Sequence, residues 1–511
     1  MLLATPIHSR LRRLRRAVSW ALARLRPGPS TVAAALGCLL VGLVCGTTAA
    51  GGPRRTGGEV APDWTGAWSV SSQRLSTGWN PPTGRGRSPR TVPAPSPVPS
   101  PVPSSVPSPG PSSVPSPVPS PGPSSRPSPG TTGPTGRPAT RPAAPEPFPV
   151  DATLRMLVRP TLGGSAVRIR LANTFGEGPV TFAAVGVAVA AGTGPALEPE
   201  TSRAVTFGGS QTVTVPAGGR VLSDPVALAL RYGQDLVVDL GVSRHQVTVT
   251  GHASAGFPCL AAQGNQVGEG TGAPFTTRLS SWLWLEAVDV VRDPGVGDAV
   301  VVLGDSLADG RRSGPAFDRR WTDLLAARLN RLPAEQRHAV LNQGVAGNRV
   351  LRAATCCGAN DAALTRLGRD ALTQAGTGTV IIAVGVNDVR DGASAGSVIA
   401  GLSQLAAQAR AAGLRTVGVT LTPFGCDLGC PGAEVESVRA EVNAWIRSGE
   451  AYDGVIDADR ILRDPERPDR LLSAYDCGDH LHLNDAGNAA MAAGVDLAVL
   501  DGTAGGDRAV R

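Results

Sequence analysis

The fold is decided by the stretch Ala299-Val300-Val301-Val302-Leu303-Gly304-Asp305-Ser306-Leu307. An uninterrupted apolar run that ends in glycine and polar residues is typical of a parallel strand buried on both faces. Apolar runs at 339–342, 379–384, 416–421 and 454–457 alternate with helical patterns at 321–332, 394–412 and 433–447. This alternation predicts an α/β domain over 296–503, with a parallel sheet between two layers of helices and a ligand site beyond the carboxyl ends of its strands.

The region upstream of this domain has a different rhythm. Residues 152–291 contain short β-prone runs, among them 166–171, 212–215 and 236–240, separated by Gly, Pro, Asn and Asp. Many short strands without a long helical period predict a β-sandwich of jelly-roll type over 150–295.

A Pro/Ser-rich segment interrupts the chain at 88–149. Its repeated Pro-Ser units lack apolar side chains able to offset the entropy of folding, so we expect an extended linker or insertion there. The aromatic island at 64–70 precedes it and is too short to fold alone. We therefore expect 60–87 to supply the first strands of the β-sandwich.

The first 50 residues have the order of a secretory leader. Several Arg residues precede an apolar run at 32–45, which small residues follow up to Ala50. The run is shorter than the ~20 residues of a spanning helix. We expect a cleaved signal peptide and a secreted protein, with an uncleaved signal-anchor in the membrane as the alternative.

The net charge of +7 does not indicate a nucleic-acid partner. The sequence has no Lys, and its Arg residues are scattered without a recognition motif for nucleic acids. With nucleic acid set aside, the expected binding partner is the substrate, either a small molecule or a polymer.

Six cysteines remain once Cys38 and Cys45 are assigned to the leader. An even number in an exported protein predicts disulfides, with Cys356 and Cys357 bonded to different partners and one of them to Cys477. A metal site at Cys426-x-x-x-Cys430 is the competing interpretation. The disulfide candidates are Cys259, Cys356, Cys357, Cys426, Cys430 and Cys477.

Four short elements follow predicted strands or close the domain. Ser306 at the end of the first strand can present its hydroxyl to a cleft, although Asp and Ser also favour turns and caps there. Gly347 lies in a turn after 339–342, where its backbone N–H could donate to an oxyanion, and Asn387 follows 379–384 with a side-chain amide. Both residues are also ordinary turn residues.

The fourth element is Asp479-His480-Leu481-His482. An Asp three residues before a His can bond the imidazole Nδ1 and leave Nε2 to accept a serine proton. His480 is the alternative base, and a metal site formed by both histidines with Asp485 is a further alternative.

Together and in this order, the four elements resemble the Ser, Gly, Asn and His blocks of the SGNH (GDSL-type) hydrolase family, over about 299–500. The resemblance implies a flavodoxin-like α/β/α fold and a serine ester hydrolase that needs no cofactor or metal. It also implies Ser306 as nucleophile, His482 as base, Asp479 as its orienting partner, and Ser306, Gly347 and Asn387 as the oxyanion hole. Turns at 173–176 and 223–226 are similar to the N-terminal sandwich of secreted family members.

The expected substrate is a short acyl ester, such as an acetyl ester, of a carbohydrate. A lipase or arylesterase is the alternative, and a catalytically silent protein that binds glycan is the rival from another class. In that rival, Trp282 and Trp284 of the sandwich would contact the sugar, whereas buried core aromatics are the simpler interpretation.

Overall fold

The structure of the protein is a computed structural model that describes residues 62–76, 152–242, 248–253, 259–311, 319–354, 360–427 and 432–501. The predicted leader (1–50) and the predicted linker (88–149) lie outside these ranges. Within the described ranges, the structure contains no helix that is long and apolar enough to cross a membrane.

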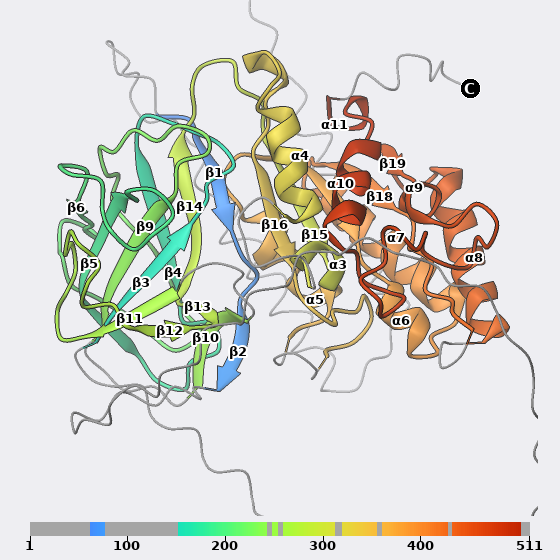
Figure 1. Ribbon diagram of the computed structural model, residues 1–511, viewed down its shortest axis with the longest axis horizontal. Helices are drawn as coiled ribbons and strands as arrows, with labels where there is room; N and C mark the ends of the chain where they lie inside the picture. Colours follow the sequence, from blue (N-terminus) through green and yellow to red (C-terminus); the bar gives the residue numbers. More distant parts are fainter. Residues whose placement is uncertain are drawn as a thin grey trace, which may run out of the picture. The chain divides into compact units, whose positions relative to one another are not determined.

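A parallel sheet organises the C-terminal half of the described chain (Figure 1). Its strands are β15 (Ala299–Gly304), β16 (Val340–Gly344), β17 (Thr377–Ala383), β18 (Arg415–Val419) and β19 (Gly454–Ile456), in the spatial order β16-β15-β17-β18-β19. All four ladders are parallel. This is the flavodoxin-like order, whose ligand crevice lies where the chain direction reverses, beyond the ends of β15 and β17. The predicted α/β fold is confirmed.

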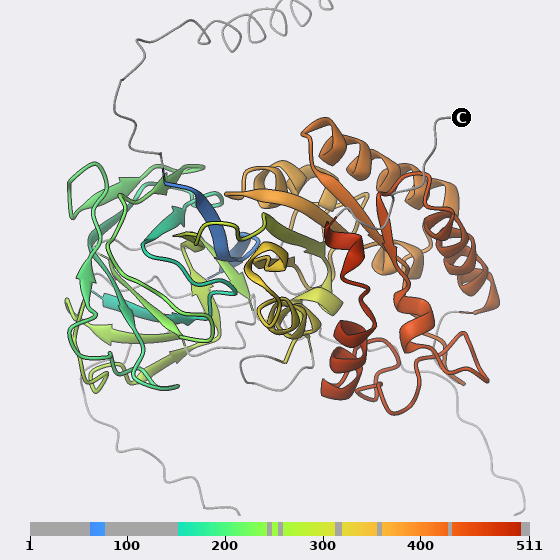
Figure 2. The same ribbon diagram turned by 90° about the horizontal axis from the view of Figure 1, so that it is seen from above.

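Helices cover both faces of this sheet because β15 is apolar on both faces. Val301 and Leu303 pack in one buried cluster with residues of α7 (Ala395–Ala411) and α8 (Ala433–Ser448). Val300 and Val302 pack in a second with residues of α4 (Trp321–Leu329) and α10 (Asp485–Gly494). Figure 2 shows the two helical layers from above. The helices are α3 (Ser306–Asp309), α4 (Trp321–Leu329), η1 (Ala334–Gln336), α5 (Ala363–Leu367), η2 (Gly368–Leu372), α6 (Val386–Arg390), α7 (Ala395–Ala411), α8 (Ala433–Ser448), α9 (Ala458–Leu462), α10 (Asp485–Gly494) and α11 (Ala498–Asp501).

Antiparallel strands form the N-terminal part, as the short β-prone runs predicted. They pair in the orders β1-β14-β4-β8, β13-β10-β2 and β12-β11-β3-β9-β5-β6, with β7 against β5. Their bounds are β1 (Trp64–Ser69), β2 (Gln73–Ser76), β3 (Ala152–Val158), β4 (Val167–Ala172), β5 (Val180–Val189), β6 (Arg203–Ala204), β7 (Val213–Val215), β8 (Arg220–Leu222), β9 (Leu236–Val242), β10 (Thr248–Ala253), β11 (Cys259–Gln263), β12 (Thr277–Leu279), β13 (Ser281–Leu283) and β14 (Leu285–Val291).

The aromatic island forms β1, which pairs antiparallel with β14 from the far side of the Pro/Ser-rich segment. In Figure 1, the blue strand β1 runs beside β14 and also lies near β16. The N–H of Gly66 donates to the carbonyl of Ala375 at 2.8 Å, and the N–H of Val340 donates to Thr161 Oγ1 at 3.0 Å. Since β16 is the edge strand of the parallel sheet, the sandwich covers that edge.

The cysteine prediction is wrong at two positions. Cys259 and Cys477 are free thiols. Cys259 lies on β11 in the sandwich core, where it packs as a small apolar side chain and burial raises the pKa of its thiol. Cys477 is on the loop before His482, where burial also raises its pKa. Cys426 is disulfide-bonded, and Cys356, Cys357 and Cys430 lie outside the described residues.

Candidate active site

Ser306 is the first residue of α3, directly beyond the carboxyl end of β15. Two glycines permit this close approach of the helix to the sheet. A Cβ atom on Gly304 would lie 2.4 Å from the Cβ of Ala308, and one on Gly344 would lie 2.3 Å from the backbone nitrogen of Asp309. The glycines at the ends of β15 and β16 therefore set where α3 and its serine lie.

Three of the predicted site residues form one hydrogen-bonded row. His482 Nε2 lies 2.9 Å from Ser306 Oγ, and His482 Nδ1 lies 2.8 Å from Asp479 Oδ2. The other oxygen of Asp479 accepts the backbone N–H of His482 at 2.8 Å. The carboxylate therefore holds both the ring and the backbone of the histidine, and a carboxylate on Nδ1 leaves Nε2 as the acceptor that faces the hydroxyl.

The alternative base, His480, has a different partner. Its backbone has a φ of 61°, and its Nδ1 lies 2.7 Å from Asp476 Oδ2. Its side chain is half exposed, whereas Ser306 and His482 are buried. The structure therefore brings His482 and not His480 to the serine.

Electrostatic surroundings favour a neutral His482. Burial lowers the pKa of the imidazole, Asp479 opposes this effect, and the positive charges of Arg311 and Arg390 lower the pKa further. The net shift is downward. For Asp479, burial favours the protonated form, but the hydrogen bonds from His482 outweigh it and hold the pKa of the carboxyl below its usual range. Near neutral pH, this combination gives an ionised Asp479 beside an imidazole able to accept a proton.

Asp305, between the strand and the serine, has another role. Its side chain caps α3 by accepting the N–H of Leu307 at 3.0 Å. Burial first, and then the nearby carboxyls of Asp388 and Asp309, raise the pKa of Asp305 to about 7. It is a structural cap that titrates near neutrality.

Of the two further predicted donors, Gly347 lies in the loop after β16 and Asn387 lies in the first turn of α6, and a hydrogen bond joins the two segments. Gly347 has a φ of 72°, a left-handed conformation that favours glycine. Asn387 Nδ2 donates to the carbonyl of Asn348 at 2.9 Å, and the N–H of Val345 donates to the carbonyl of Gly304 at 3.2 Å. An amide nitrogen carries two N–H groups, so Asn387 keeps one for a ligand.

The sequence interpretation missed the residues that hold the loop of Gly347. Asp388 accepts the N–H groups of Val350 and Leu351 at 2.7 and 3.1 Å. Asp309 Oδ2 accepts the N–H of Ala346 at 3.1 Å. Asp388 directly follows a predicted site residue, which was the one local signal. No sequence motif around Asp309 indicated its role in holding the loop.

Arg366 was also missed. It is fully buried and donates to the carbonyls of Gly304 and Gln343 at 2.7 and 2.8 Å and to Asn348 Oδ1 at 3.0 Å. It therefore joins the ends of β15 and β16 to the loop that carries Gly347. A single Arg within a helical pattern gives no sequence signal for such a role.

The alternative metal site is not assembled. His480 and His482 bond to different carboxylates, and Asp485 pairs with Arg319. Among the described residues, ligand atoms of Asp476, Cys477 and Asp479 do lie within 4.8 Å of one another. Both carboxylates already bond to a histidine, and the raised pKa of Cys477 disfavours the thiolate that a metal needs. This cluster therefore does not fit a metal ion well.

Residues 302–490 match the family model described as the GDSL-like Lipase/Acylhydrolase family. These residues form a GDSL-like lipase/acylhydrolase domain. The match contains Ser306, Gly347, Asn387, Asp479 and His482, and it identifies the protein as a serine ester hydrolase. The recognition of this family from the sequence is confirmed, and the rival of a silent glycan-binding protein is not supported.

Solved structures similar to a part of the chain share 17–19% sequence identity with it. One is a putative lipolytic protein from Desulfitobacterium hafniense (17% identity, 39% of this chain and 97% of that one, TM-score 0.30). A second is an aryl esterase from M. smegmatis (19% identity, 39% of this chain and 95% of that one, TM-score 0.31). A third is a carbohydrate acetylesterase family member from Sinorhizobium meliloti (18% identity, 40% of this chain and 99% of that one, TM-score 0.33). A comparison with curated proteins found no match.

Proposed function

We propose that the protein is a secreted esterase that uses Ser306 as nucleophile, His482 as general base and Asp479 as the group that orients the base. The observation that carries this proposal is the row of hydrogen bonds from Ser306 Oγ through His482 to Asp479, at 2.9 and 2.8 Å. The proposed oxyanion donors are the N–H groups of Ser306 and Gly347 and the side-chain amide of Asn387.

The reaction has two steps. As Ser306 Oγ attacks the ester carbonyl carbon, its proton moves to His482 Nε2, and the carbonyl oxygen becomes an oxyanion held by the three donors. Collapse of this intermediate breaks the C–O bond to the alcohol, which leaves with the proton from His482. Water, deprotonated by His482, then attacks the acyl-enzyme, and the acid leaves as Ser306 recovers its proton.

Short acyl esters of carbohydrates are the proposed substrates, on the basis of the exported character of the sequence and the attached sandwich. The sandwich itself offers no exposed sugar platform at Trp282 or Trp284, since each is 1% exposed. Any carbohydrate would therefore contact the GDSL-like domain or other surfaces of the sandwich.

The apolar cavity nearest the site bears on the lipase or arylesterase alternative. An apolar cavity is lined by Leu307, Val386 and Leu483, the neighbours in sequence of Ser306, Asn387 and His482. Its remaining lining is also mostly apolar, with Val384, Leu421, Leu462 and Met491 among it. With a volume of about 30 Å³, this cavity is too small for an aryl group or a long acyl chain, so it adds no support to that alternative.

The test measures release of acetate from acetylated xylan and of p-nitrophenol from esters of increasing acyl length. Ser306→Ala should abolish both activities and labelling by a fluorophosphonate, with an unchanged melting temperature. Ser403→Ala, an exposed serine on α7, is the matched control and should behave as wild type. Near-normal hydrolysis by Ser306→Ala would refute the proposal, and activity that rises with acyl length would favour the lipase.

Secretion is tested separately. The leader lies outside the described residues, so the support for export is its order of Arg residues, apolar run and small residues. N-terminal sequencing of protein recovered from the culture medium should find a start near residue 50. A full-length chain retained in the membrane fraction would indicate the signal-anchor alternative.

A further inference from the structure

His252 of the sandwich reaches into the GDSL-like domain. It lies on β10 and is 2% exposed. Its Nε2 is 3.0 Å from Asp309 Oδ1, on α3 only three residues after Ser306, and its Nδ1 is 2.9 Å from the backbone carbonyl of Ser71. The ring of Trp282 packs against the imidazole at 5.9 Å. The histidine is therefore fixed on the sandwich side and touches the helix that begins with the proposed nucleophile.

Both ring nitrogens of His252 face acceptors. A backbone carbonyl can only accept, so Nδ1 carries a proton. Asp309 also accepts the N–H of Ala346 through its other oxygen. An ionised carboxylate needs a donor at Nε2, so the ring donates from both nitrogens and forms a charge-assisted bond to Asp309.

Asp309 links this bond to the proposed oxyanion loop. Its Oδ2 accepts the N–H of Ala346 at 3.1 Å, and Ala346 directly precedes Gly347. An oxyanion donor must point at the developing charge, so small displacements of Gly347 reduce its effect. The chain His252–Asp309–Ala346 therefore fixes the loop from the sandwich side.

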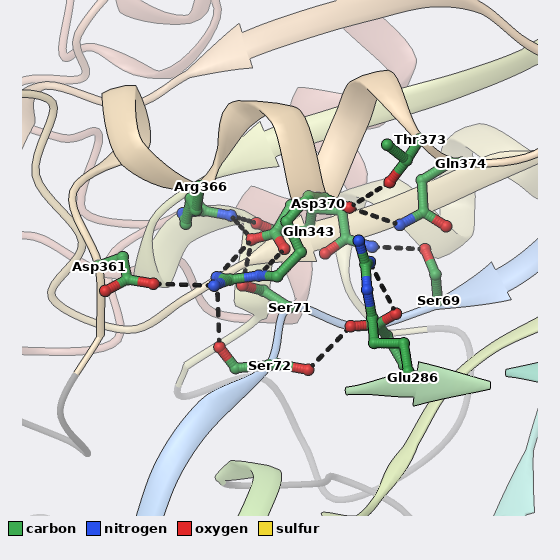
Figure 3. Close-up of polar contacts among 12 residues, drawn as sticks. Ser69, Ser71, Ser72, Glu286, Gln343, Asp361, Arg366, Asp370, Thr373 and Gln374 are labelled. Atoms are coloured by element: carbon green, nitrogen blue, oxygen red, sulfur yellow. Dashed lines mark hydrogen bonds and ion pairs between the residues drawn. The ribbon is translucent and has the colours of Figure 1, made fainter. Parts of the chain in front are cut away.

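The same segment of the sandwich also reaches a second support of the loop, and Figure 3 shows Ser71 beside Asp370 and Arg366. The hydroxyl of Ser71, whose carbonyl accepts from His252, donates to Asp370 Oδ2 at 2.5 Å. Asp370 pairs with Arg366 at 2.9 Å, and Arg366 donates to Asn348. Burial disfavours ionised Asp370, but Arg369 and Arg366 outweigh it and lower its pKa. Ser71 thus contacts both supports of the loop, one at Ala346 and one at Asn348.

We propose that His252 is a positioning residue for ester hydrolysis, which holds the Ala346–Gly347 loop in its oxyanion-binding conformation through Asp309. The inference rests on the proposed function, because it assigns an oxyanion donor to Gly347. It makes the sandwich an integral part of the active-site scaffold.

The test compares two substitutions of His252 in the full chain, each of which can replace the hydrogen bond of only one ring nitrogen. Asn in place of His252 can reach the Ser71 carbonyl but not Asp309, whereas Gln can place its amide near the position of Nε2 and donate to Asp309. For p-nitrophenyl acetate, His252→Asn should lower kcat about 10- to 100-fold with KM unchanged, less than the ~100- to 1,000-fold of losing a whole donor. His252→Gln should keep kcat within about threefold of wild type, because it restores the Asp309 contact.

Several outcomes would overturn the inference. Wild-type kcat in His252→Asn, or equal loss in both variants, would show that the Asp309 contact does not act on the loop. If His252→Asn does not fold, ¹⁵N-histidine spectra of the wild-type protein decide, because a His252 ring with only one protonated nitrogen would contradict the assigned pair. Failure of the proposed function is separate, since it would appear as retained hydrolysis in Ser306→Ala.

Discussion

At the residue scale, the protonation of His482 should determine where kcat/KM falls on the acidic side of the pH profile. Burial first, and then Arg311 and Arg390, lower its pKa despite the opposing Asp479. A base with a lowered pKa stays neutral to lower pH, so kcat/KM should fall only below the usual histidine value of ~6.5. The exposed Arg390 lies on α6, and Arg390→Gln should move this fall upward by a fraction of one pH unit. If the pH at which kcat/KM falls moves downward or does not change, Arg390 does not lower the pKa of His482.

Asp305 gives a second prediction at this scale, on stability. Its pKa is raised to about 7, whereas an unfolded chain has ~3.9. The folded state therefore favours the protonated carboxyl, and this contribution to stability is fully present below pH ~4 and is lost as pH rises from there through the folded pKa of about 7. Asn can still accept the N–H of Leu307 without a charge. Asp305→Asn should raise the free energy of unfolding near pH 8 by up to a few kcal/mol and change it little near pH 4. Urea titrations at both pH values measure this, and a gain larger at the acidic pH would contradict it.

At the scale of elements, the approach of α3 to the sheet depends on glycine. A Cβ on Gly344 would lie 2.3 Å from the backbone nitrogen of Asp309, so Gly344→Ala must displace α3 or β16. We expect a loss of about 1–3 kcal/mol in stability and a lower kcat, because Ser306 moves with α3. Gly396→Ala on α7 is the matched control. No atom lies within 4 Å of its added Cβ, and it should gain about 0.5–1 kcal/mol. Similar effects of both substitutions on kcat would refute the role of Gly344.

The elements also show what the sequence could predict. The run 299–304 is buried along its whole length, so its apolar pattern alone predicted β15, and α7 and α8 begin and end within a residue or two of expectation. Ser306, Asp479 and His482 were predicted from short local motifs and the family resemblance that those motifs carry, and the Asp and His share one loop. Arg366, Asp309 and His252 were not, since their roles come from contacts between distant segments that no local pattern records. The disulfide prediction failed at Cys259 and Cys477 for the same reason, because a count of cysteines says nothing of the distances between them.

At the scale of the whole molecule, the sandwich and the parallel sheet share one core. Trp68 and Trp282 of the sandwich belong to the same buried cluster as Leu341 and Leu303 of the parallel sheet. Gln343 donates to Ser69 at 2.6 Å, across the same boundary. The sandwich is thus part of the structural support of the GDSL-like domain, in contrast to an accessory module on a linker.

The GDSL-like domain alone should therefore fold poorly. A chain of residues 296–511 would lose the bonds of Val340 to Thr161 and of Asp370 to Ser71, and it would expose Leu341 at an unpaired sheet edge. We expect it to aggregate or to melt well below a chain of residues 62–511, the matched control, which keeps the compact unit Pro62–Arg511. Thermal melting and p-nitrophenyl acetate hydrolysis of both chains measure this. A soluble 296–511 chain with the melting temperature and kcat of the control would show that the domain needs neither the covered edge nor the His252–Asp309 contact, because both are absent from it.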